Sequence, residues 1–287
     1  MIEVTGLLKR CARESGVRLD ILEKDYALSY LLAAIATEPA LEKELVLKGG
    51  TALRKCYYSG YRFSEDLDFS TRSPGGIPGL QEKIFAAVER MRRLLQGRGP
   101  FQVQFEPLVL REPHPFAQAA FLVRVQFPAH HQPLCRLKVE VTVDEPLLLP
   151  PEKRHILHDY PEPFRSEVSV YSLAEIVAEK LRALLQSKSR LQARGWGGSR
   201  VCRDYYDLWS ILQRERLAVS IPDLVRQKCA LRGLTLVGPA DFFAEPLLQI
   251  ARAEWRTQIL PFVPNAPGAE QVLAALQRQV EQLWNSW

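Results

Sequence analysis

Two short motifs combine residue types that could carry out phosphate chemistry. The first is Lys48-Gly49-Gly50-Thr51, and the second, after fourteen intervening residues, is Asp66-Leu67-Asp68. Side chains two residues apart on a β-strand point to the same face, so Asp66 and Asp68 would project together while Leu67 faces the core. Two converging carboxylates repel each other, and a bound hard cation such as Mg²⁺ relieves that repulsion. We therefore expect a metal-binding pair on this strand.

The glycine motif would suit a phosphate group. Gly49 and Gly50 follow the short apolar run 45–47 and precede helix formers over 52–58, a pattern that predicts strand, turn and helix. Gly50 and Thr51 at a helix start would offer backbone N–H groups and a hydroxyl, and the helix dipole favours an anion there. Asp-x-Asp can be an ordinary turn and Gly-Gly mere tight packing. The two motifs in this order favour a metal beside the triphosphate that it bridges.

A later strand could supply a third carboxylate. Over residues 137–143 the valines alternate with polar residues, so the valines would share the core face and Lys138, Glu140 and Thr142 the other face. Two-metal phosphoryl chemistry uses carboxylates to clamp metals about 4 Å apart. Glu140 is our candidate, because Asp144 lies at the proline-bounded end of the strand. The alternative is that Glu140 simply faces solvent.

A second cluster of charged residues lies further along the chain. Lys180 precedes a Gly-Trp-Gly-Gly loop, and Arg203, Asp204 and Asp207 follow it. Asp204 and Asp207 are three residues apart and would be neighbours on one helix face. Lys180 and Arg203 could simply form ion pairs with them. Alternatively, Lys180 neutralises charge on a nucleotide, and one aspartate acts as a base or positions the second substrate.

The stretch from Lys180 to Arg203 is a candidate surface for nucleic-acid phosphates, because it contains seven basic residues and no acidic one. The basic residues are Lys180, Arg182, Lys188, Arg190, Arg194, Arg200 and Arg203. Trp196 lies in the glycine loop of this stretch and could stack on an unpaired base, a contact worth about 1–3 kcal/mol. The alternative is that Trp196 packs on its own domain.

Composition restricts the class of protein. The 287 residues have a net charge of +5, with 47% hydrophobic and 25% charged residues, which excludes a disordered, collagen-like or coiled-coil chain. Five scattered cysteines without zinc-ligand spacing favour a reducing compartment. The longest apolar run, 27–36, is about half of the roughly 20 residues that span a bilayer, and the N-terminus lacks the apolar stretch of a signal peptide. We therefore expect a cytoplasmic protein without membrane contact.

The periodicity of the chain predicts an α+β fold in two domains, 1–160 and 161–287. Helices are expected at 20–37, 52–58, 79–95 and 172–186, the last opened by a capping box of Ser172 and Glu175. Strands are expected at 45–47, 62–70, 101–110, 119–127, 135–143 and 168–171. The segment 145–164 contains five prolines and is interpreted as the crossing between the domains. The remainder of the second domain is expected to be mainly helical.

Five blocks of sequence, in this order, resemble the AbiEii/AbiGii nucleotidyltransferase toxin family. The blocks are Glu23-Lys24-Asp25-Tyr26, Leu47-Lys48-Gly49-Gly50-Thr51-Ala52-Leu53, Arg62-Phe63-Ser64-Glu65-Asp66-Leu67-Asp68-Phe69, Glu179-Lys180-Leu181 and Arg203-Asp204-Tyr205-Tyr206-Asp207-Leu208. The resemblance runs from about Leu22 to Leu212, and the C-terminal quarter resembles no family that we can name. Each block is modest by itself, but five in order are specific.

The resemblance implies a polymerase-β-like nucleotidyltransferase domain with a small mixed sheet, followed by a helical domain. Members of the family are toxins of phage-defence and toxin-antitoxin systems, and some transfer nucleotides from an NTP to the 3′ end of tRNA. By position, Gly50 and Thr51 match the phosphate-contacting pair and Lys180 the motif lysine. Asp66 and Asp68 match the metal-binding aspartates, and the late aspartate is Asp204 or Asp207.

We therefore predict an Mg²⁺-dependent nucleotidyltransferase of the EC 2.7.7 type, with a two-metal site, an NTP substrate, tRNA as the expected acceptor and a possible cognate antitoxin. The predicted catalytic residues are Asp66, Asp68, Glu140, Lys180, Asp204 and Asp207. The predicted nucleotide-binding residues are Lys48, Gly49, Gly50, Thr51, Lys180 and Arg203, and the predicted metal ligands are Asp66, Asp68 and Glu140. Two alternatives remain: nucleotidylation of a protein or small molecule, and a catalytically silent module that binds NTP or RNA.

Overall fold

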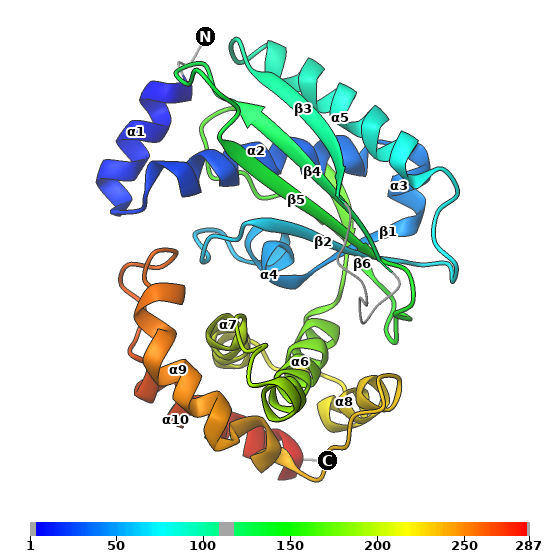
Figure 1. The fold of residues 1–287 in the computed structure, drawn as a ribbon, viewed down its shortest axis with the longest axis vertical. Helices are drawn as coiled ribbons and strands as arrows, with labels where there is room; N and C mark the ends of the chain where they lie inside the picture. Colours follow the sequence, from blue (N-terminus) through cyan, green and yellow to red (C-terminus); the bar gives the residue numbers. More distant parts are fainter. Residues whose placement is uncertain (1–3, 109–117, 286–287) are drawn as a thin grey trace. The chain divides into compact units, whose positions relative to one another are not determined.

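The computed structural model describes residues 4–108 and 118–285 in two compact units, Met1–Tyr171 and Ser172–Trp287 (Figure 1). The first unit contains a β-sheet and its covering helices, and the second consists of helices. The α+β prediction is therefore confirmed. The domain extents 1–160 and 161–287 stay a prediction.

The strands of the first unit form one seven-stranded mixed sheet in the order β3-β4-β5-β2-β1-β7-β6. They are β1 (Leu45–Lys48), β2 (Asp66–Thr71), β3 (Gln102–Leu108), β4 (Gln118–Gln126), β5 (Cys135–Thr142), β6 (Glu152–His155) and β7 (Glu167–Val170). Two pairings, β2 with β5 and β1 with β7, are parallel, and the others are antiparallel. The motif-bearing strands β5, β2 and β1 are thus adjacent at the centre of the sheet.

The helices of the first unit pack on the sheet and on one another. They are α1 (Val4–Ser15), α2 (Leu19–Ala36), α3 (Pro39–Glu44), α4 (Gly49–Ala52), which continues as the π-helical turn η1 (Leu53–Tyr57), and α5 (Leu80–Gln96). Helix α2 packs against β5, β7 and α5, and α5 packs against β3 (Figure 1). Leu67 and Phe69 of β2 and Val139 and Val141 of β5 are fully buried, as strand alternation requires of a core face.

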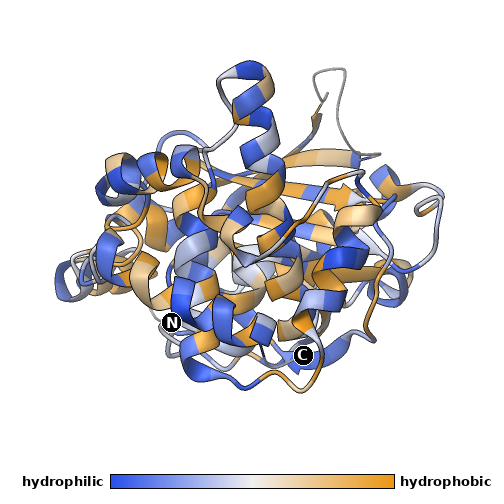
Figure 2. Cartoon of the chain, turned by 90° about the horizontal axis from the view of Figure 1, so that it is seen from below, coloured by the Kyte–Doolittle hydropathy of each residue, from blue (hydrophilic) through white to orange (hydrophobic). Residues whose placement is uncertain are grey.

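The second unit contains helices joined by loops. They are α6 (Leu173–Arg194), α7 (Val201–Arg214), α8 (Ile221–Ala230), the 3₁₀ turn η2 (Pro239–Phe243), α9 (Glu245–Gln258) and α10 (Ala269–Asn285). The Ser172 hydroxyl accepts a hydrogen bond from the Glu175 N–H, at 3.3 Å, and so caps α6 as predicted. Hydrophilic and hydrophobic residues alternate along the helices (Figure 2), so each helix can bury one side. Helix α6 packs on α7 and α8, and α7 packs on α10.

Three predictions about local structure need correction. The segment 145–164 is not a crossing between units, because it lies in the first unit and contains β6, which pairs with β7. Helix α6 continues past Gln186 to Arg194, since no breaker precedes Gly195, whose φ is +73°. The helix expected from Ala52 begins three residues earlier, at Gly49.

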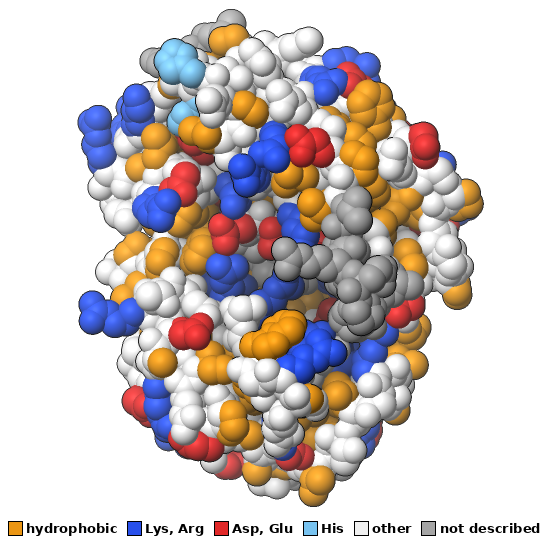
Figure 3. Space-filling model, viewed as in Figure 1, with side chains coloured by type: hydrophobic (Ala, Val, Ile, Leu, Met, Phe, Trp, Pro, Cys, Tyr) orange, Lys and Arg blue, Asp and Glu red, His pale blue; other side chains and the backbone are white. Residues whose placement is uncertain are grey.

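The end of the strand expected at 101–110 lies outside the described residues, whose strand β3 ends at Leu108. Among the described helices, none combines the length and the apolar character needed to cross a membrane. On the face drawn in Figure 3, acidic and basic side chains are interspersed and hydrophobic atoms form scattered patches.

Candidate active site

Strand register places the three predicted metal ligands on one face of the first unit's sheet. Asp68 of β2 lies opposite Glu140 of β5, and Asp66 lies opposite Lys138. Directly paired residues on adjacent strands point to the same face, and Asp66 and Asp68 share a face by alternation. Because the core residues of both strands point the other way, the three carboxylates lie on the face opposite the core.

The glycine turn packs directly against this carboxylate face. Gly49 has a φ of +76°, in the left-handed region that favours glycine, and a Cβ atom there would lie 2.9 Å from Oδ2 of Asp68. The Thr51 hydroxyl donates a hydrogen bond to the backbone carbonyl of Asp66, at 2.5 Å. The structure thus brings the two motifs into contact, and it leaves no room for a side chain at Gly49.

Two lysines accompany the carboxylates on the same sheet. Nζ of Lys138 lies 2.6 Å from Oε1 of Glu140, and Lys48 lies opposite Asp68 on β1. Lys48, a predicted nucleotide-binding residue, places its Nζ 2.9 Å from Oε2 of Glu145. Glu145 was absent from the predicted site, and the separation of 97 positions between the partners gives no local sequence signal for the pairing.

The donor set of the carboxylate face fits a divalent cation. Asp66, Asp68 and Glu140 offer only oxygen ligands, which hard cations such as Mg²⁺ prefer, and their shared face brings like charges together. The side chains do not form a closed ligand set: in the part of the chain that the structure describes, no three His, Cys, Asp or Glu residues group closely enough to hold a metal. The Glu140 carboxylate points instead to Lys138.

The second cluster is compact within the helical unit. Nζ of Lys180 lies 2.9 Å from Oδ1 of Asp204 and 2.7 Å from Oδ2 of Asp207. Asp207 is fully buried, whereas 11% of the Asp204 side chain is exposed. The Arg203 guanidinium lies over the Phe262 ring, 4.5 Å from its centroid. The structure therefore joins Lys180 with both candidate aspartates and directs Arg203 to an aromatic ring.

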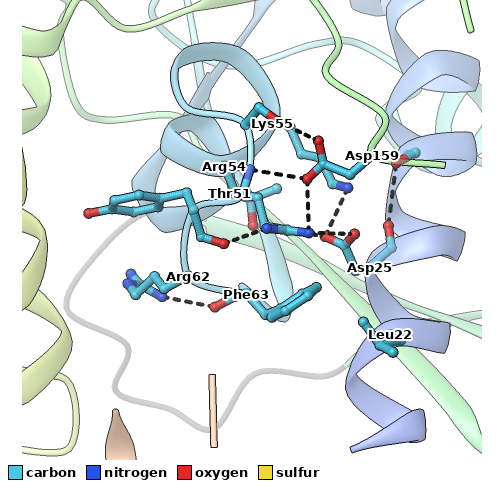
Figure 4. A network of polar contacts seen from close by, with 12 residues as sticks. Leu22, Asp25, Thr51, Arg54, Lys55, Arg62, Phe63 and Asp159 are labelled. Atoms are coloured by element: carbon cyan, nitrogen blue, oxygen red, sulfur yellow. Dashed lines mark hydrogen bonds and ion pairs between the residues drawn. The ribbon is translucent and has the colours of Figure 1, made fainter. Parts of the chain in front are cut away.

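A buried charge cluster behind the glycine turn was missed by the sequence-based site prediction (Figure 4). Asp25 of α2 is fully buried, and its Oδ1 lies 2.5 Å from Nε of Arg54 and 2.8 Å from Nζ of Lys55. The Tyr160 hydroxyl donates to its Oδ2, at 3.1 Å, and Arg54 also pairs with Asp159, at 3.3 Å.

The ionised form of Asp25 is strongly favoured in this cluster. Burial acts to raise the pKa of its carboxyl, but the neighbouring Lys55 and Arg54 charges outweigh burial and hold that pKa well below its ordinary range. The only sequence signal for Asp25 was its place in the first block of the family resemblance, because its partners lie between 29 and 135 residues away.

The basic stretch of the second unit presents an aromatic ring to solvent. Trp196 lies in the loop after α6 with 65% of its surface exposed, and the Arg194 guanidinium lies 5.7 Å from its ring centroid. Burial lowers the pKa of Arg190, and the neighbouring Arg194, Arg182 and Arg200 lower it further, as expected where like charges gather. The exposed ring shows that Trp196 does not pack into its own unit.

Comparison with known families decides the class of protein. A family model described as nucleotidyl transferase AbiEii toxin, type IV toxin-antitoxin system, matches residues 30–278. The chain belongs to this family. The match extends beyond Leu212 through most of α10, so the C-terminal helices that resembled nothing by inspection are part of the family fold.

A solved structure supports the same fold. MenT4, a nucleotidyltransferase toxin from Mycobacterium tuberculosis H37Rv, matches with a TM-score of 0.62 and 22% identity, covering 98% of this chain and 89% of that chain. Among curated proteins, none matches.

Family membership establishes a nucleotidyltransferase that acts as the toxin of a type IV toxin-antitoxin system. The predicted enzyme class and family are therefore confirmed. The family implies a nucleotide substrate and a cognate antitoxin, and its members generally use a divalent metal.

Proposed function

We propose that the protein transfers a nucleoside monophosphate from an NTP to the 3′ end of tRNA and depends on Mg²⁺. The observation that carries this proposal is the carboxylate face of the sheet, with Asp66, Asp68 and Glu140 on adjacent strands and the glycine turn packed against Asp68. Three carboxylates gather on this face beside a turn suited to phosphate, and a divalent cation is the partner that such gathered oxygen ligands suit.

In the proposed site, Asp66, Asp68 and Glu140 would hold two Mg²⁺ ions. When bound, the metal supplies charge neutralisation for the triphosphate and lowers the pKa of the attacking hydroxyl. Gly50 and Thr51 donate backbone N–H groups to the phosphates and orient the α-phosphate, while the Thr51 hydroxyl stays bonded to the Asp66 carbonyl. The acceptor hydroxyl oxygen bonds to the α-phosphorus as the α–β phosphoanhydride bond breaks, pyrophosphate leaves, and the hydroxyl proton passes to solvent.

Four charged residues of the second unit are also assigned to the reaction. Lys180 is assigned to the triphosphate or base of the nucleotide and Arg203 to nucleotide binding, while Asp204 or Asp207 positions the acceptor. In the structure Asp204 and Asp207 hold Lys180 between them. This pairing supports a role for both aspartates in orienting the Lys180 ammonium, since two carboxylates restrict it more than one does.

The acceptor is inferred from the basic stretch. Its arginines and lysines suit the phosphates of an RNA strand, and the exposed Trp196 ring suits stacking on the unpaired terminal base of tRNA. We place the reaction in the cytoplasm, because each of the five cysteines is a free thiol, as expected in a reducing compartment. The phage-defence role is proposed from membership of the toxin family.

The test incubates purified protein with total tRNA, Mg²⁺ and each α-labelled NTP in turn, and reads the label on a denaturing gel. We expect label on tRNA with the wild type and with Asp20→Ala, which removes an exposed carboxylate that pairs with Arg18 at the surface. Asp66→Ala should give none, and EDTA should abolish the signal. Label on protein or on a small molecule would reject the tRNA acceptor, and NTP binding without pyrophosphate release would reject catalysis.

A further inference from the structure

The two glycines of the turn are required for different reasons. Gly49 adopts a left-handed backbone angle, whereas Gly50 does not, so the backbone conformation does not explain a glycine at position 50. A Cβ atom on Gly50 would overlap Nη2 of Arg62 and would lie 3.2 Å from both Cζ of Arg62 and Oγ of Ser64. The Arg62 guanidinium therefore occupies the space that a side chain at Gly50 would need.

The loop that carries Arg62 is held in place by Arg54 (Figure 4). Arg62 donates from Nη1 to the carbonyl of its neighbour Phe63, at 3.2 Å. The Phe63 ring covers the Arg54 guanidinium, 3.8 Å from its centroid, and Arg54 donates from Nη1 to the carbonyl of Tyr61. One arginine thus contacts the residues on both sides of Arg62.

Arg54 also belongs to the helix that begins at the glycine turn. It lies in η1, directly after α4, and Asp25 binds two of its guanidinium nitrogens. The start of the loop is fixed as well, because Asp159 accepts hydrogen bonds from the Ser59 hydroxyl at 2.8 Å and the Gly60 N–H at 3.3 Å. The buried cluster around Asp25 therefore connects the turn with the loop that faces it.

We propose that Arg62 is a positioning residue for the nucleotide-binding turn, and that the Asp25–Arg54 pair holds it there. The inference rests on the proposed function, since it assigns the turn to the triphosphate. A guanidinium in the side-chain space of Gly50 fixes the turn and adds positive charge beside the bound anion. Its removal leaves the turn free to move and weakens NTP binding.

The contact is tested by a double-mutant cycle of wild type, Gly50→Ala, Arg62→Ala and the double variant. Each is measured for thermal midpoint and for binding of the four NTPs with Mg²⁺ by calorimetry. We expect Gly50→Ala to lower the midpoint in the wild-type background, where the Arg62 guanidinium must shift, and to lower it less in the Arg62→Ala background, because the group that the methyl overlaps is then absent. Additive effects of the two changes would overturn the contact.

The positioning role is tested by binding and by hydrogen exchange. We expect Arg62→Ala to weaken NTP binding at least about tenfold, the scale of losing a hydrogen bond from a charged donor, and to speed amide exchange over residues 49–53. Arg62→Lys should give NTP affinity and exchange rates between those of the wild type and those of Arg62→Ala. Arg72→Ala is the matched control, because Arg72 binds Ser169 elsewhere on the sheet, and it should change neither readout.

The failure of this inference differs from the failure of the proposed function. Binding and exchange in Arg62→Ala equal to those of the wild type would overturn the positioning role. A wild type that binds NTP but labels no tRNA would reject the proposed acceptor alone. If the wild type binds no NTP, the exchange rates and the thermal cycle still decide whether Arg62 fixes the turn. If Arg62→Ala does not fold, the same decision is made with Arg62→Lys.

Discussion

The sheet carboxylates and Asp25 are acidic groups of the same unit in opposite surroundings. Asp25 is completely buried and is met by two cations and a tyrosine hydroxyl. Asp66 and Asp68 are partly exposed and share a sheet face with a third carboxylate, Glu140. A buried carboxylate that contacts more than one cation of the protein serves to stabilise the fold. Gathered negative charge at a partly open face leaves carboxylates that a cation can still bind.

The largest expected effect is loss of activity on changing a sheet carboxylate. Asp68→Asn keeps the shape that packs on Gly49 but removes the charge, so nucleotide transfer should fall by about 10³-fold or more, as expected for losing several kcal/mol of metal-dependent stabilisation. The free energy of unfolding, measured in urea, should change by less than about 1 kcal/mol, because Asp68 is partly exposed. A loss of stability instead of activity would break the comparison.

Asp25→Asn should have the reverse signature. Lys55 would lose its carboxylate partner and Arg54 would keep only Asp159 of the two that the structure gives it, and breaking a buried ion pair in this way costs about 3–5 kcal/mol of stability. Urea unfolding measures the loss, with Asp20→Asn as the exposed control. Transfer activity per folded molecule should fall far less than in Asp68→Asn.

The difference in the free energy of unfolding between wild type and Asp25→Asn should depend on pH. Because the folded-state pKa of Asp25 is depressed, its stabilisation is present above the unfolded pKa of about 3.9 and is lost as the pH falls through the folded pKa. The difference should therefore be constant from about pH 5 to 8 and shrink below about pH 4. Urea unfolding at each pH measures it, and a difference that grows with acid would contradict the assignment.

The cluster of the helical unit gives a smaller contrast. Asp207 is more buried than Asp204, although both bind Lys180. Asp207→Asn should cost about 3 kcal/mol of stability, near the low end for a buried pair, and Asp204→Asn about 1 kcal/mol, because water can replace part of its interaction. Thermal unfolding of the two variants shows which one loses more stability. Equal losses would show that the exposure of the carboxylate does not determine its contribution to stability.

Trp196→Ala should have the smallest effect, confined to RNA. With most of its ring exposed, its loss should leave the thermal midpoint unchanged and weaken tRNA binding by about 1–3 kcal/mol, the value of one stacked base. Val237→Ala is the control, because Val237 is exposed in the same unit but outside the basic stretch. Equal tRNA affinity in all three proteins would remove Trp196 from the acceptor surface.

Local patterns were enough to predict the strands that carry the candidate site. Alternation in Asp66-Leu67-Asp68-Phe69 and in Val139-Glu140-Val141 fixed which side chains face the core, because strand geometry has a period of two. The family blocks then indicated the chemistry. The strand β6, Glu152–His155, was missed because its four polar residues show no apolar alternation.

Partners distant in sequence could not be predicted. Lys48 was assigned to the nucleotide from its place in the glycine motif, and nothing nearby pointed to Glu145. Asp25 lies on a helix that is buried along nearly its whole length. The hydrophobic pattern of this helix therefore predicted neither the position of a buried charge nor its partner. Such pairings depend on which strands and helices become neighbours, and only tertiary structure determines that.

The order of strands in the sheet has a consequence for the protein during its synthesis. Strand β1 acquires its second neighbour only from β7, and β2 only from β5. A ribosome adding about 5–20 residues per second needs several seconds to pass from the glycine motif to β7. Until then the nascent chain has unpaired strand edges around its own motif residues. The toxin is therefore made with a delay between the appearance of its reactive residues and the completion of the sheet that arranges them.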